Sequence, residues 1–144
     1  MKKRTVIFIN GVLLFWFFLD MIGLRIGDRL IVSRAFREDG VFFIIYLVLF
    51  VLFVYRERSG RFMLSAWLFL WFASQFFSHW YVTIFGPADE KIGYFSDTVK
   101  IISSSEIYIP DLYHSVLHLL IVAAFITVVA YQRLHLGPGN KKRH

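Results

Sequence analysis

The sequence predicts an all-α integral membrane protein: a bundle of four transmembrane helices with a long outer loop between helices three and four. Of its 144 residues, 58% are hydrophobic and 19% are aromatic, a composition unlike that of a soluble domain of this length. The apolar residues form four runs separated by short charged segments. A helix needs about 20 such residues to cross a bilayer, so we expect one transmembrane domain over residues 1–144.

The charged residues support the same class of protein. The formal net charge is +6, but Lys and Arg lie in clusters between the apolar runs, where they orient helices and bind anionic lipid. We therefore expect the lipid bilayer as a partner and no nucleic acid. The chain has no cysteine, which excludes disulfides, thiolate metal sites and iron–sulfur clusters.

The first membrane-spanning segment is predicted at about residues 5–24. A basic start followed by an apolar run resembles a signal peptide, but no small-residue cleavage pattern follows, so we expect the segment to be retained. Residues 25–40 mix charged and apolar side chains, which indicates either a short amphipathic helix at the interface or a connecting loop. The second segment, at about 39–55, carries no evident chemistry and is expected to pack or to face lipid.

A basic turn at residues 56–61 joins the second segment to the third, which is predicted at about 62–85. Gly86 and Pro87 end that helix, because proline cannot continue it. Residues 86–110 form the longest connection, and a loop of this length between hydrophobic helices is often functional. The fourth segment is predicted at about 111–133, and residues 134–144 are expected to form a flexible basic tail.

The distribution of Lys and Arg predicts the orientation in the cell membrane. Ten of these residues lie on the side of the termini and of the 56–61 turn, and six lie in residues 25–40 and 86–110. Positive charge is enriched on the cytoplasmic side. We therefore expect a multi-pass protein with both termini in the cytoplasm.

Ionisable side chains from three segments share one depth near the outer side. Asp111, His114 and His118 follow steps of three and four residues, which return to one face of a helix. Asp20 and His79 belong to the first and third segments. With a rise of about 1.5 Å per residue, all except Asp111 at the segment end lie about 5 to 10 Å below the outer ends of their helices. Such groups are costly in a membrane and usually face a partner, a cavity or a ligand.

A divalent metal site is the first interpretation of this cluster. Histidines four residues apart can bind one ion from a single helix turn. A helical protease motif would need a glutamate where Ser115 stands, so that mechanism is not supported. Gln75 and Glu106 are candidates for outer hydrogen-bonding or acid–base groups. The predicted metal ligands are His79, His114, His118, Asp20 and Asp111.

Three other interpretations remain open at this point. A b-type haem could be held between His79 and His118, since two helices would each supply an axial histidine at the same depth. The cluster could also form a proton or ion relay, although the inner half of the bundle has few polar residues to continue one. Finally, histidines near the membrane surface can simply make hydrogen bonds to lipid headgroups.

We therefore expect a small membrane protein with a histidine and carboxylate site at its outer face. That site would bind a divalent metal or haem and catalyse a reaction on an interfacial substrate. The alternative is a non-enzymatic membrane subunit or assembly factor whose polar cluster packs against a partner. A second copy of the chain could also complete the site. No motif in the sequence specifies a reaction.

Overall fold

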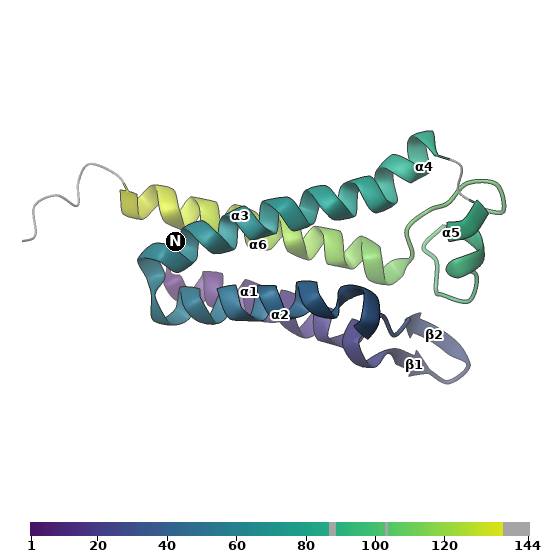
Figure 1. Ribbon diagram of the computed structural model, residues 1–144, viewed down its shortest axis with the longest axis horizontal. Helices are drawn as coiled ribbons and strands as arrows, with labels where there is room; N and C mark the ends of the chain where they lie inside the picture. Colours follow the sequence, from purple (N-terminus) through teal and green to yellow (C-terminus); the bar gives the residue numbers. More distant parts are fainter. Residues whose placement is uncertain (87–88, 103, 137–144) are drawn as a thin grey trace, which may run out of the picture.

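Four long helices lie side by side in the computed structural model of the protein (Figure 1). The structure describes residues 1–86, 89–102 and 104–136. Each long helix packs against two others, in the closed order α1, α2, α3 and α6. The chain is thus mostly helical, as the sequence predicts. The long helices are α1 (Lys3–Ile22), α2 (Phe36–Tyr55), α3 (Glu57–Gln75) and α6 (Leu112–Leu136).

Three of these helices are long and apolar enough to cross a membrane: α1, α2 and the Leu112–His135 part of α6. The third predicted segment has a more complex backbone. Residues 57–85 follow one helical path, in which α3 is succeeded by a π-helix, η1 (Phe76–Tyr81), and by a short helix, α4 (Val82–Phe85). The π-helix is a wider turn and therefore interrupts the α-helical register near the end of this path.

The helices meet along regularly spaced apolar residues. In α6 the buried residues Leu117, Ile121, Ala124 and Val128 follow steps of four and three, which place them on one face. The opposite faces are also apolar, and side chains such as Leu119 stay exposed. A helix that is apolar on all sides suits an apolar solvent, in agreement with the membrane class.

Polar contacts join the helices at the end that holds the start of α1 and the end of α6. Lys3 Nζ is 3.2 Å from a carboxylate oxygen of Glu57, and the Tyr131 hydroxyl donates to Glu57 Oε1 at 2.6 Å. These contacts connect the start of α1, the start of α3 and the end of α6. Of the predicted tail, residues 134–136 belong to α6, and residues 137–144 lie outside the described part of the chain.

The segment after α1 differs from the prediction. Residues 25–40 form neither a helix throughout nor a plain loop: β1 (Leu24–Ile26) and β2 (Arg29–Val32) pair as an antiparallel hairpin, and α2 already begins at Phe36. The turn contains Gly27 at a φ of 58°, a backbone conformation that favours glycine. The hairpin lies at the end opposite the start of α1 and the end of α6, on the side of the short helix α5 (Asp89–Tyr94) (Figure 1).

Gly60 allows α2 and α3 to approach closely, and its replacement tests this packing. A Cβ atom at Gly60 would lie 2.3 Å from the Phe53 Cα atom, whereas one at Gly11 would meet nothing within 4 Å. We expect Gly60→Ala to destabilise the protein by about 2 kcal/mol or more through overpacking. Gly11→Ala should leave stability unchanged or raise it, because alanine favours a helix. Thermal unfolding of detergent-purified protein measures both, and equal melting temperatures would contradict the packing.

Candidate functional site

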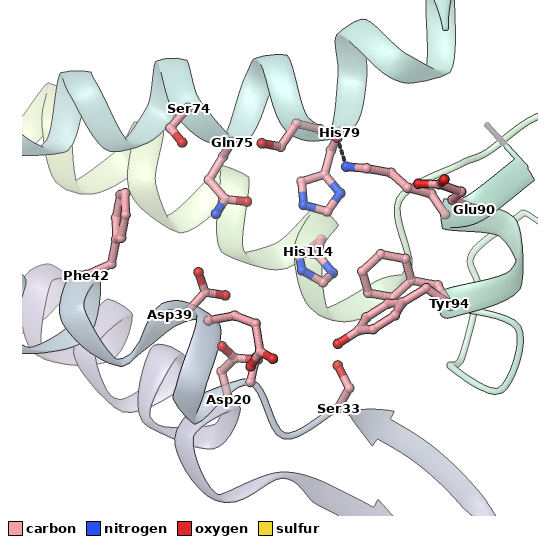
Figure 2. Close-up of a pocket in the computed structure, with 15 residues that line it drawn as sticks. Asp20, Ser33, Asp39, Phe42, Ser74, Gln75, His79, Glu90, Tyr94 and His114 are labelled. Carbon is pink, nitrogen blue, oxygen red and sulfur yellow. Dashed lines mark hydrogen bonds between the residues drawn. The ribbon is translucent and has the colours of Figure 1, made fainter. Parts of the chain in front are cut away.

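A cavity of about 420 Å³ opens among the helices at the end that carries the hairpin (Figure 2). One wall comes from the end of α1 and the start of α2, and carries Asp20 and Asp39. The facing wall carries His79 of η1 and His114 of α6. Residues of α5 and its continuation close the third side. The volume lies within the range of small-molecule sites, about 300 to 1,000 Å³.

Two carboxyl groups meet on the first wall. Asp20 in the last turn of α1 and Asp39 in the first turn of α2 lie within hydrogen-bonding reach of each other. Asp20 is 2% exposed, and its Oδ2 atom has no hydrogen-bond partner among the described residues. Carboxylates this close repel each other, so such a pair is stabilised by a shared proton or by a cation.

Asp111 and His114 form a dyad at the start of α6. Asp111 Oδ1 accepts hydrogen bonds from the His114 backbone N–H at 2.9 Å and from the His114 ring Nδ1 at 2.7 Å. Asp111 precedes the spanning helix. Burial alone would raise the pKa of its carboxyl group, but the hydrogen bonds from His114 outweigh burial, so the pKa is lowered. A carboxylate can only accept, so the His114 ring carries a proton on Nδ1. Its Nε2 atom makes no hydrogen bond to the described residues, and an imidazole that carries its single proton on Nδ1 can act as a base at Nε2.

His118 has the opposite tautomer. The Trp80 ring donates from Nε1 to His118 Nδ1 at 2.9 Å, and an indole N–H can only donate. The neutral His118 ring must therefore carry its proton on Nε2. That atom is buried and has no partner among the described residues. His118 is thus a hydrogen-bond donor without an acceptor, one helical turn deeper than His114.

The π-helix positions His79 between the other two histidines. Its ring centroid is 4.3 Å from that of His114 and 5.5 Å from that of His118. The ring Nδ1 is hydrogen-bonded to the Tyr108 hydroxyl. Consecutive residues are separated by a smaller angle in a π-helix than in an α-helix, so His79 and its neighbour Trp80 can both contact residues of α6.

Helix α5 and Phe95 contribute the third wall of the cavity. Lys91 of α5 reaches back to the backbone carbonyl oxygen of Ser78 in the π-helix. Burial lowers the pKa of Lys91. Tyr108 and Phe95 pack together against the His79 ring, and burial raises the pKa of the Tyr108 hydroxyl. Lys91, Phe95 and Tyr108 therefore hold the site together.

The structure brings most of the predicted site residues together. His79, His114 and His118 form one cluster, Asp20 and Gln75 line the same cavity, and Asp111 supports His114. Glu106 is exposed and does not line the cavity. Within residues 1–86, 89–102 and 104–136, no group of three or more histidine or carboxylate side chains is placed to hold a metal ion. The His79 and His118 rings contact each other directly and would have to separate before a porphyrin could lie between them.

Sequence reasoning missed several residues of the site. Asp39 lies at the start of the second predicted segment, for which the sequence indicates no chemistry, and only the three-dimensional meeting of α1 with α2 gives it a partner. The sequence indicates no specific role for Trp80 and Tyr108, since aromatic residues are common near a membrane surface. Each has a polar atom that a buried environment must satisfy, and the nearby histidines supply the partners. The neighbouring histidines were the one signal available in the sequence.

No protein-family model, curated protein or solved structure matches this chain.

The tautomers of His114 and His118 provide a direct test of the site geometry. ¹⁵N spectra of histidine-labelled protein should show His118 protonated at Nε2 with Nδ1 as an acceptor, and His114 protonated at Nδ1. Trp80→Phe removes the donor to His118 and should allow both tautomers of that ring. Trp67→Phe is the matched control, because Trp67 Nε1 has no partner among the described residues. An unchanged His118 signal in Trp80→Phe would contradict the hydrogen bond.

The lowered pKa of Asp111 predicts how its contribution to stability depends on pH. A group whose pKa is lower in the folded state than in the unfolded state stabilises the protein at pH values above its unfolded pKa, which is about 3.9 for aspartate. That contribution is lost as pH falls through the folded pKa. We expect Asp111→Asn to melt at a lower temperature than the unaltered protein at about pH 6, and the difference to narrow toward about pH 3. A constant difference across this range would contradict the dyad.

Proposed function

We propose that the protein is a membrane-embedded acid–base catalyst that acts on an amphiphilic substrate at the outer surface of the bilayer. The observation that carries this proposal is the Asp111–His114 dyad, whose free Nε2 atom belongs to a ring that lines a cavity of substrate size. A histidine oriented by a carboxylate is a common general base. The cavity lies at one end of the helices, where a membrane lipid could reach it from the side.

The proposed topology is a bundle of four membrane-spanning helices with both termini in the cytoplasm. The fourth spanning element would be the continuous helical path from Glu57 to Phe85, which packs between α2 and α6. The excess of Lys and Arg at the end of the termini supports this orientation. In this orientation the cavity lies near the outer surface of the cell membrane.

The proposed chemistry is hydrolysis of an ester or phosphoester bond. His114 Nε2 takes a proton from a water molecule as the water oxygen forms a bond to the reacting centre. The bond to the leaving oxygen then breaks, and the same histidine returns the proton to that oxygen. Asp111 stabilises the charged imidazolium between these two steps. His79, in contact with the His114 ring, would restrict that ring to one orientation.

A divalent metal site is the second candidate function. The specific observation in its favour is that the Asp20–Asp39 pair offers oxygen donors to the same cavity that His114 and His79 line. Elemental analysis and an absorption spectrum of purified protein test this candidate and haem together. Metal in stoichiometric amount or a Soret band, lost in the His79→Ala/His118→Ala variant, would establish a ligand site. The non-enzymatic alternative expects neither, and instead expects the same variant to lose a partner protein.

The catalytic proposal predicts loss of turnover without His114. Purified protein is incubated in H₂¹⁸O with vesicles of a total polar lipid extract, and ¹⁸O in the products is measured by mass spectrometry. We expect His114→Gln to lower the rate by about 100-fold or more, which is the usual contribution of a general base.

The matched control for this experiment is His135→Gln, at the opposite end of α6. His135 Nδ1 contacts the Tyr131 carbonyl oxygen, far from the cavity, so this variant should keep the full rate. Equal rates in the unaltered protein and in His114→Gln would refute the catalytic role. An absence of protein-dependent products from any lipid would favour the partner-subunit alternative.

A further inference from the structure

A second pocket adjoins the cavity, and its charge is opposite. It has a volume of about 300 Å³ and is lined by Arg34, Phe36, Arg37 and Glu38. Glu38 also lines the large cavity, so the two spaces share a wall. In the described part of the chain, neither arginine lies within 4.0 Å of a carboxylate. Arginines placed this way are suited to bind a phosphate group.

The large cavity offers the complementary sign. Asp20 and Asp39 face each other without a cation within 4.0 Å in the described residues, and the unpartnered Oδ2 of Asp20 is buried. A primary ammonium group would satisfy this pair, because it brings one positive charge and three donors. Phe36, at the arginine pocket, is 58% exposed, as expected of an aromatic side chain beside the acyl region of a bilayer.

We infer that the site recognises a phospholipid whose headgroup carries a phosphodiester and a primary ammonium group. The phosphodiester lies on Arg34 and Arg37, and the ammonium group lies between Asp20 and Asp39. A short link between phosphate and amine matches two pockets that share one residue. This inference rests on the proposed function, since it names the substrate class of the same site.

Native mass spectrometry of the purified protein tests the inference. The probe is an equal mixture of phosphatidylethanolamine, phosphatidylcholine and phosphatidylglycerol with the same acyl chains. We expect phosphatidylethanolamine to be retained about tenfold over the other two, the effect of one charge-assisted hydrogen bond. Equal retention of the three lipids by the unaltered protein would overturn the inference, whatever the variants do.

Two double variants separate the contributions of the two pockets. Arg34→Gln/Arg37→Gln should lower retention of all three phospholipids, because each carries a phosphate. Asp20→Asn/Asp39→Asn should remove only the preference for the primary amine. The controls are Arg25→Gln/Arg29→Gln in the hairpin and Asp28→Asn/Asp97→Asn. These four residues are exposed and lie outside both pockets. Equal losses in the controls would overturn the assignment.

A soluble headgroup distinguishes the source of the ligand. Glycerophosphoethanolamine, added at millimolar concentration, should not displace the bound lipid. Displacement would assign the site to a soluble phosphodiester and overturn the lipid assignment. Because this is a binding measurement, its outcome is separate from that of the ¹⁸O experiment. Selective retention without turnover would leave the inference standing and remove the catalytic proposal.

Discussion

The hydrogen bonds from His114 to Asp111 are the interaction on which the rest of the site depends. One carboxylate oxygen accepts both the backbone N–H and the ring N–H of His114. The first bond satisfies an otherwise unpaired N–H at the start of α6. The second fixes the ring tautomer. A helix start and a reactive side chain are thus controlled by the same atom, so the geometry of the site is set where the helix begins.

The two ends of the helices serve different purposes. At the end of the termini, Lys3, Glu57 and Tyr131 join three helices through polar contacts, and Gln132 of α6 donates to the Arg61 carbonyl of α3. At the other end, several buried polar atoms have no partner in the described residues, among them Asp20 Oδ2 and His118 Nε2. Unsatisfied groups reduce stability. Two of these atoms, Asp20 Oδ2 and Gln75 Oε1, belong to residues that line the cavity, where a bound ligand would satisfy them.

The sequence predicted the membrane class, the approximate positions of the long helices and the gathering of three histidines, because helical periodicity and depth determine these features. It missed the hairpin, because the alternation of apolar and polar residues over 24–32 is too short to indicate two strands and the two-residue turn was not recognised. Asp39 was missed for a different reason. Its role depends on contact with Asp20 from another helix, and no spacing along the chain reveals such a contact. The tautomers of His114 and His118 likewise follow from the positions of Asp111 and Trp80 in space, which the sequence does not reveal.

The π-helix makes the geometry of the path from Glu57 to Phe85 depend on the number of residues in it. A π turn contains one residue more than the α turn that it replaces, so residues 76–81 accommodate one extra residue within the helix and without a loop. Loss of one of these residues would return the stretch to α-helical geometry and change the directions of the side chains and carbonyl groups within it, while the flanking helices keep their register. Trp80 would then turn away from His118, and the Ser78 carbonyl would move from Lys91. Insertions are tolerated in surface loops, but in this apolar stretch the contacts of the site depend on the number of residues.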